Sequence, residues 1–311
     1  MAIQWFVPLS ISIFIGSILQ AILLKRLADR DARSAAQLIG FCGAAALALA
    51  FGLMRNDVVF DGASLTVIAI GFVNALAARA HVEATRINMA FASVYLIMDD
   101  VLAMALAWFV LNEGRFMTPS IAAGGTLAVA TALFFTIYRN QKAEIKRLKN
   151  PEEKTETKQA VPDEWKLFAY VFGFSITWGV AIFSMRYFNV GPVQLQASRF
   201  LWCWYSGAAL GAGLIYSLDK SSRSKISIQQ TIEAFGLGLT MITSLALTYW
   251  SLSYADKPQI ALQPIYLIAG MILPTFLGLY YFKEIESLDG NEKLLLALAM
   301  TSGAIISFGL S

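Results

Sequence analysis

The chain has 311 residues, of which 57% are hydrophobic and 14% are charged, with a mean hydropathy of +0.60. A soluble domain averages about 45–50% apolar and about 25% charged residues. The composition therefore excludes a disordered chain, a coiled coil and an ordinary soluble enzyme, and it predicts an integral membrane protein. A net charge of only +3 provides no strong field for nucleic acid. Two cysteines without a CxxC pair, and one histidine, predict neither a metal site nor another cofactor.

Long apolar runs follow one another along the whole chain. A hydrocarbon core of about 30 Å is crossed by about 20 helical residues. Charged or helix-ending residues separate most of the runs that reach this length. The ten predicted spans are residues 5–24, 34–54, 63–82, 88–111, 117–138, 165–184, 192–217, 229–252, 258–282 and 293–310.

The polar segment 139–164 divides the spans into five and five, and we predict that it is a partly disordered linker. The halves 1–138 and 165–311 carry weak internal similarity. A shift of 171 residues places Ala84–Ile97 on Ala255–Ile268, with Tyr95 on Tyr266. An odd number of spans per repeat reverses the second copy in the membrane. The predicted fold is therefore an all-α integral membrane protein with ten transmembrane helices in two inverted five-helix repeats. The alternative is a duplicated scaffold that transports nothing.

Two adjacent acids, Asp99 and Asp100, lie in the middle of the span 88–111. Charged residues inside a membrane are costly and persist against partners or water. We therefore expect at least one of these carboxylates to face a central cavity and to bind a proton, a cation or a substrate amine. The alternative is an acid satisfied by a neighbouring helix. Asn74, central in the span 63–82, is a further candidate for substrate binding and for hydrogen bonding across helices.

Arg199 lies in the first third of the span 192–217. Two interpretations remain open for it. In the first, it binds a substrate carboxylate or pairs with Asp99 or Asp100. In the second, its long side chain reaches the membrane interface.

Four polar residues cluster at the end of the span 63–82, namely Arg79, His81, Glu83 and Arg86. Arg79 and Glu83 are four positions apart, so they can pair on one face of a helix. The cluster is either an interfacial group of charges or, through Arg79, His81 and Glu83, a gate or proton relay.

Prolines and aromatic residues gather in the second half. Pro258, Pro264 and Pro274 lie in one span, and a proline inside a helix frees a carbonyl and kinks the helix. A broken helix at a repeat interface is typical of a substrate site, although a harmless kink is the alternative. The candidate substrate-binding residues in addition to Asp99, Asp100, Arg199 and Asn74 are Tyr95, Trp178, Gln263 and Tyr266.

Several short motifs resemble those of the drug/metabolite transporter superfamily of the EamA type. AWFVLNEGRF and GLYYFKEIES both close an apolar run in a glutamate, Glu113 and Glu284, which we interpret as structural anchors. Thr177-Trp178-Gly179 and the run GPVQLQASRF are also similar to that family, whereas the first half has Ile15-Gly16 in place of Trp-Gly and lacks the matching arginine in its second span. The resemblance implies a ten-helix transporter of small metabolites with both termini in the cytoplasm.

The charge bias gives a different orientation from the one that the resemblance implies. The loops on the linker's side of the membrane carry 19 Lys and Arg, against four on the other side. Basic residues favour the cytoplasmic side, which would place the linker 139–164 in the cytoplasm and both termini outside. The expected location is a bacterial inner membrane.

The expected function is secondary active transport of a small organic metabolite by alternating access. An acid and an arginine suit an amino acid or a related zwitterion, moved outward and with possible proton coupling. The expected partners are thus a small-molecule substrate, protons and membrane lipids. The alternatives are an exporter of amphipathic cations or drugs and, less favoured, a membrane-embedded enzyme or a channel. No GxxxxGK[ST] motif for an ATP-driven pump is present, and we expect no enzymatic activity.

Overall fold

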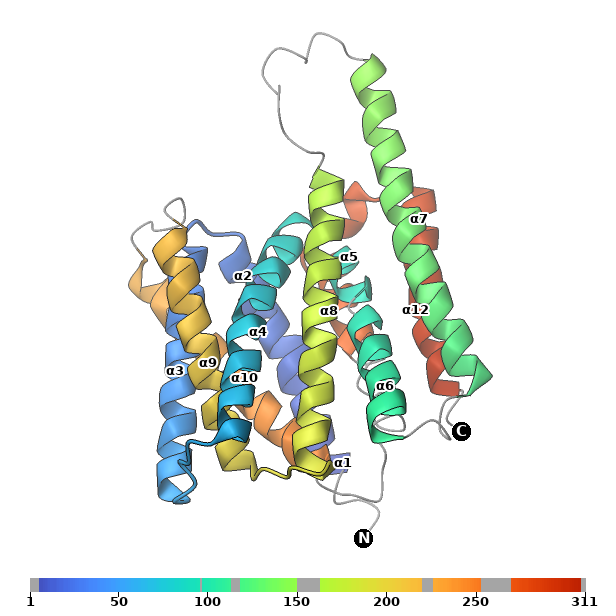
Figure 1. The fold of residues 1–311 in the computed structure, drawn as a ribbon. Coiled ribbons are helices and arrows are strands. Elements are labelled where there is room, and N and C mark those ends of the chain that lie inside the picture. Colours follow the sequence, from blue (N-terminus) through green and yellow to red (C-terminus); the bar gives the residue numbers. More distant parts are fainter. Residues whose placement is uncertain are drawn as a thin grey trace.

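The computed structural model describes residues 6–95, 97–112, 118–149, 163–219, 226–252 and 270–308, and these residues form helices and connecting turns without a strand. Figure 1 shows the helices side by side, with α7 and α12 together at one edge of the bundle. The elements are α1 (Phe6–Phe14), the π-helical η1 (Ile15–Gln20), α2 (Ala21–Ala28), α3 (Arg33–Met54), α4 (Gly62–Ile87), α5 (Met89–Tyr95), α6 (Ile97–Leu111), α7 (Pro119–Lys149), α8 (Asp163–Val190), α9 (Ala197–Leu218), α10 (Ile228–Leu252), the π-helical η5 (Leu277–Tyr281), the 3-10 helix η6 (Glu284–Ser287) and α12 (Gly290–Phe308).

Seven helical stretches among the described residues are long and apolar enough to cross a membrane. They are Val7–Ala28, Arg33–Met54, Gly62–Ile87, Met89–Leu111, Pro119–Lys142, Trp165–Val190 and Ile228–Ser251. A shorter apolar helix, Gly270–Tyr281, covers the described part of the predicted span 258–282. The chain is thus an all-helical protein with the helix content of an integral membrane protein.

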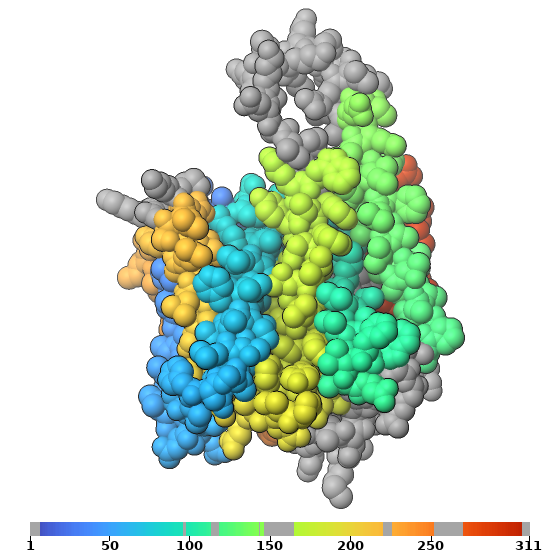
Figure 2. Space-filling model, in the orientation of Figure 1, coloured from blue at the N-terminus to red at the C-terminus, as the bar shows by residue number. Residues whose placement is uncertain are grey.

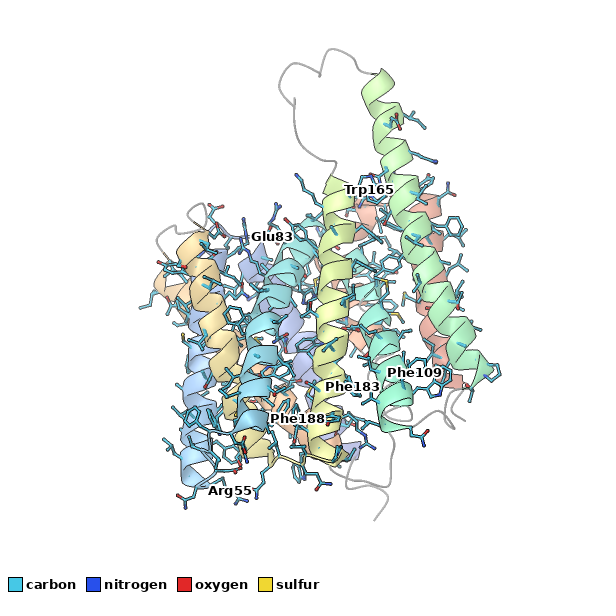
Figure 3. All side chains as sticks on the ribbon, viewed as in Figure 1. Arg55, Glu83, Phe109, Trp165, Phe183 and Phe188 are labelled. Carbon is cyan, nitrogen blue, oxygen red and sulfur yellow. The ribbon has the colours of Figure 1, made fainter. Side chains whose placement is uncertain are left out.

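Two ends of the bundle can be defined from labelled residues (Figure 3). Glu83 and Trp165 lie at the end that we call the upper end, and Arg55 and Phe188 lie toward the lower end. Consequently α4 runs from the lower to the upper end, whereas α3 and α8 run from the upper to the lower end.

Extensive helix contacts join the two halves of the sequence. Helix α9 packs against both α3 and α4, and α10 packs against α3. Glycines allow the backbones to approach at these crossings. A Cβ on Gly71 of α4 would lie 2.1 Å from the carbonyl oxygen of Trp204, and one on Gly207 of α9 would lie 2.0 Å from that of Ile68. A Cβ on Gly238 of α10 would lie 2.2 Å from the carbonyl oxygen of Gly40 in α3. Only a residue without a side chain fits at such distances.

Helix α7 continues to Lys149, well beyond residue 138, where the predicted span ends. Residues 139–149 of the segment predicted to be a partly disordered linker are therefore helical, and residues 150–162 lie outside the described part of the chain. The helix is supported by contacts with α12: Arg139 pairs with Glu292 at 3.1 Å, and Lys142 pairs with Asp289 at 2.7 Å. Asp289 and Glu292 also cap the start of α12 through each other's backbone N–H groups.

Candidate functional site

A cavity of about 260 Å³ lies inside the bundle. Its walls come from the first helix (α1, η1 and α2), from α3, α4, α5, α6, α8, α9 and α10, and from the helix Gly270–Tyr281. Both halves of the sequence thus contribute to one space. In the space-filling view, side chains of α4, α6, α7 and α8 form a continuous front face, so the cavity is not visible from that side (Figure 2).

Both predicted acids line this cavity. Asp99 is 3% exposed and Asp100 is 9% exposed, and they lie in the first turn of α6. The neighbouring helix α8 comes close because residue 179 is glycine, where a Cβ would lie 2.7 Å from the carbonyl oxygen of Asp99. Among the described residues, no basic side chain forms an ion pair with Asp99.

Two buried amides add hydrogen-bond acceptors. Asn74 of α4 lines the cavity, is 1% exposed, and its Oδ1 atom has no hydrogen-bond partner within the described part of the chain. Gln37 of α3 donates from Nε2 to the carbonyl oxygen of Ala75 at 2.8 Å, while its Oε1 atom is likewise without a donor there. A buried acceptor without a donor is costly, so these oxygens favour a ligand or water that carries N–H or O–H groups.

A cluster of hydroxyl groups lies at the contact of α1 and α10. Ser12 Oγ is 2.9 Å from both Ser244 Oγ and Thr248 Oγ1, and it donates to the carbonyl oxygen of Ser244 at 2.8 Å. All three side chains line the cavity. The sequence alone does not indicate this cluster, because Ser12 lies 232 and 236 residues from Ser244 and Thr248 and serines and threonines inside helices are common.

Aromatic rings form one wall of the cavity. Trp178 stacks on Phe174 with ring centroids 5.8 Å apart and meets Trp204 edge-on at 6.2 Å. The His81 ring lies 4.5 Å from that of Phe174. All four rings line the cavity. Such rings present a negative face to a cation and an apolar surface to any organic group.

The charges at the end of α4 form a network outside this wall. Glu83 pairs with Arg33, Arg79 and Arg86, each at 3.0 Å, which confirms the predicted Arg79–Glu83 pair. Arg79 also pairs with Asp219 at the end of α9, at 2.7 Å. Of the three residues proposed as a gate or relay, His81 lines the cavity, and Arg79 and Glu83 lie in the ion-pair network at the upper end.

Arg199 lies at the lower end, away from the two acids of α6. It forms an ion pair with Asp61 and donates to Ser64 Oγ at 3.0 and 3.1 Å. Among the interpretations left open for Arg199, the pairing with Asp99 or Asp100 is therefore wrong. Asp61 is the N-cap of α4, and it holds Arg199 there while also accepting a hydrogen bond from the Ser64 N–H.

Acid is expected to release the contact between Arg199 and Asp61. The Arg199 hydrogen bond lowers the pKa of the Asp61 carboxyl from its ordinary value of 3.8 to about 2. A lowered folded-state pKa stabilises the fold above the ordinary value, and this contribution is lost as the pH falls through the folded value. Asp61 is solvent-exposed, so the effect is small. The apparent melting temperatures of the native protein and of Asp61→Asn, measured in detergent between about pH 6 and about pH 2, should converge below about pH 4. A constant difference would contradict this assignment.

The remaining predicted residues lie elsewhere. Tyr95 is fully buried outside the cavity, where its hydroxyl donates to the carbonyl oxygen of Thr131 at 3.1 Å. Gln263, Tyr266 and Glu113 lie outside the described residues. Glu284, interpreted as an anchor, accepts hydrogen bonds from the N–H groups of Met89 and Ala90 and pairs with Lys25 at 3.2 Å.

The site as a whole combines carboxylates, amide and hydroxyl oxygens, and aromatic rings around one cavity. Within the described part of the chain, no group of three or more His, Cys, Asp or Glu residues could hold a metal ion. The arrangement suits reversible binding of a small organic solute that carries hydrogen-bond donors or a positive charge.

No family model and no curated protein matches the chain. Among solved structures, one described only as a crystal structure of protein is similar over 98% of this chain and 98% of its own length. The TM-score is 0.61 and the sequence identity is 14%. At this identity the similarity supports a shared fold and carries no information on the substrate.

Proposed function

We propose that the protein is a secondary transporter that moves a small organic solute across the membrane by alternating access. The observation that carries this proposal is the cavity with Asp99, Asn74 and Trp178, enclosed by helices from both halves of the chain. The resemblance to EamA-type transporters supports it independently. Soluble cofactors and metal chemistry have no part in the proposal.

The arrangement of the helices supports an inverted repeat within a ten-helix fold. The first helix ends at the upper end, where Lys25 contacts Glu284 and Thr85, whereas α8 begins there. The two glycine contacts are also related by one shift of 167 residues, because Gly40 then corresponds to Gly207 and Gly71 to Gly238. A contact between α3 and α10 thus has its counterpart between α9 and α4. Inverted repeats with a site at their interface are typical of secondary transporters.

Ion pairs between distant parts of the sequence hold the upper end together. Lys25 pairs with Glu284 at 3.2 Å, and Arg30 pairs with Glu233 at 3.2 Å. Arg79 and Ser34 both contact Asp219 at 2.7 Å. Alternating access requires one end to separate while the other stays closed. The pairs Lys25–Glu284 and Arg30–Glu233 are the bonds that separation of the upper end would break.

The two candidate substrate classes are zwitterions and organic cations, and they differ in whether they need a cationic partner in the cavity. A zwitterion such as an amino acid needs a cationic partner for its carboxylate, and Arg199 is held by Asp61 at the lower end. Arg33, which lines the cavity, is paired with Glu83. Asp99, Asp100 and the free amide oxygens instead favour an amine or an organic cation. We therefore place the cationic substrate first and the amino acid second, and Asp99 can also carry a coupled proton.

We further propose that the upper end faces the cytoplasm of a bacterial inner membrane. Basic residues at this end include Lys25, Arg30, Arg33 and Arg79, whereas Arg55 and Arg199 lie at the lower end. This distribution agrees with the bias of basic residues toward the cytoplasm.

The transport proposal is tested with purified protein in liposomes. The probes are benzyltrimethylammonium, a cation with an aromatic ring, and phenylalanine, a zwitterion with the same ring. Saturable uptake that is accelerated by unlabelled solute inside the vesicles identifies a carrier. Flux that does not saturate, together with discrete openings in single-channel recordings, would identify a channel instead. The absence of uptake for a wide panel of solutes would contradict the proposal.

The variant Glu284→Gln is expected to open the upper end more often. It removes the charge that Lys25 binds and weakens the acceptor for the N–H groups of Met89 and Ala90. Opening can be followed with the substitution Ser93→Cys, because Ser93 lines the cavity. The introduced thiol is reacted with a maleimide that does not cross membranes. The native cysteines are removed by the substitutions Cys42→Ser and Cys203→Ser, so that only the introduced thiol reacts.

Labelling from the upper side should be several times faster in Glu284→Gln than in the parent protein. The matched control is Glu286→Gln, two positions away, where the carboxylate is exposed. Equal labelling in both variants would show that the Lys25–Glu284 pair does not restrict access.

A further inference from the structure

A second hollow lies on the outside of the bundle, where the first helix meets the helix Gly270–Tyr281. Its volume is about 300 Å³, and carbon atoms line it. The lining residues are Ile18, Leu273, Phe276, Leu277, Tyr280 and Tyr281, which we call the outer groove. Phe276, Tyr280 and Tyr281 are 47%, 60% and 55% exposed, so the groove opens to the surroundings of the helices. For an integral membrane protein those surroundings are lipid chains.

Each of the two helices that line the outer groove contains a π-helical segment there. Ile18 belongs to the π-helical η1, and Leu277, Tyr280 and Tyr281 belong to the π-helical η5. A π-helical turn carries an extra residue and thus changes the direction of the side chains that follow it. Such turns are frequent at functional sites.

Two basic residues adjoin the upper end of the groove, Arg26 through a hydrogen bond to Tyr281 and Lys283 through its place in the chain. The Nη2 atom of Arg26 donates to the Tyr281 hydroxyl at 3.3 Å, so the guanidinium lies next to a side chain that lines the groove. Lys283 follows two residues after Tyr281 and is exposed, with a left-handed backbone at φ 58°. Within the described residues neither Arg26 nor Lys283 is paired with a carboxylate, in contrast to the neighbouring Lys25, which is bound to Glu284.

We propose that the outer groove and these two basic residues bind one anionic phospholipid. One acyl chain lies in the groove between Ile18 and Leu277, and the phosphate group is held by Arg26, the Tyr281 hydroxyl and Lys283. The chemistry is complementary at both ends of the lipid. Arginine and a hydroxyl group are strong donors to phosphate oxygens, and basic residues near the end of a membrane helix attract anionic head groups. The site is separate from the cavity of Asp99 and does not depend on what the protein transports.

The test measures lipid binding to the purified full-length protein by native mass spectrometry. The probes are phosphatidylglycerol and phosphatidylcholine with identical acyl chains, with inorganic phosphate as a third probe. The protein should retain one phosphatidylglycerol at least several times more strongly than phosphatidylcholine. The double variant Arg26→Ala/Lys283→Ala should lose about 30-fold in affinity for phosphatidylglycerol, because each basic residue near a membrane surface contributes about 1 kcal/mol.

Arg55→Ala is the matched control for charge, because Arg55 is an exposed arginine at the lower end of the bundle. Ile18→Trp fills the groove without changing its charge, and Leu19→Trp, at an exposed neighbour outside the lining, is its control. The proposal predicts weaker lipid binding for Ile18→Trp and unchanged binding for Leu19→Trp and Arg55→Ala. Equal retention of both lipids, an equal loss in Arg55→Ala, or equally strong binding of inorganic phosphate would each overturn it.

Discussion

Replacing Asp99 with asparagine is expected to remove most of the affinity of the cavity for an organic cation. The substitution keeps the size of the side chain and removes the charge from a position that is 3% exposed and lines the same cavity as the aromatic rings. Interactions with a charged group contribute about 1.5–3 kcal/mol, which corresponds to an increase of about 10- to 150-fold in Kd. Calorimetric titration of the purified protein with benzyltrimethylammonium measures this change.

Two variants separate a specific effect of Asp99 from a general effect of charge. Asp100→Asn changes the second acid of the same helical turn, and Asp31→Asn changes an exposed acid at the upper end. We expect Asp31→Asn to bind the cation as the native protein does. If uptake driven by a pH gradient were unchanged in both Asp99→Asn and Asp100→Asn, proton coupling through these acids would be excluded. If cation binding were also unchanged, the cationic substrate would be excluded as well.

The second large effect is expected from Gly207→Ala. Its new methyl group would lie 2.0 Å from the carbonyl oxygen of Ile68, so α4 and α9 would have to separate. Inserting extra atoms into a well-packed contact costs about 1–3 kcal/mol, and here the obstacle is backbone rather than a flexible side chain. The apparent melting temperature in detergent should fall by several degrees. Gly71→Ala, on the other side of the same crossing, should behave in the same way.

Gly213→Ala provides the matched control on the same helix. Among the described residues, nothing outside the adjacent backbone of α9 lies within 4 Å of a Cβ at Gly213, so the substitution should leave the melting temperature unchanged or raise it slightly. A similar decrease in Gly213→Ala and Gly207→Ala would mean that α9 is sensitive to any substitution, and the close crossing would then not be the cause.

Local patterns predicted the helices and the contacts within one helix. The charged and glycine-containing breaks place the ends of α3, α4 and α10 within a few residues of the predicted spans. The spacing of Arg79 and Glu83 predicted their ion pair. Each of these features depends on residues three or four positions apart, a distance over which helix geometry is known in advance.

Contacts between helices were harder to predict, because the sequence of one span does not determine which of its faces packs against which neighbouring helix. The sequence allowed an ion pair between Arg199 and Asp99. The start of α4 instead brings Asp61 and Ser64 into contact with Arg199. Tyr95 was aligned with Tyr266 in the repeat, but it turns toward Thr131 of α7 and away from the cavity. Gln37 and the hydroxyl cluster of Ser12, Ser244 and Thr248 carried no sequence signal, since their role follows only from the packing of α1, α3 and α10.

The backbone contacts at Gly71–Gly207 and at Gly40–Gly238 also limit how the bundle can move. Helices that touch through their main chains have no layer of side chains that could shear or repack, so α3, α4, α9 and α10 behave mechanically as one block. Any rocking is then left to the helices outside that block. The first helix and the helix Gly270–Tyr281 each contain a π-helical segment. A turn with a strained hydrogen-bond pattern bends at lower cost than a regular α-helix, and it can act as a hinge while the block stays still.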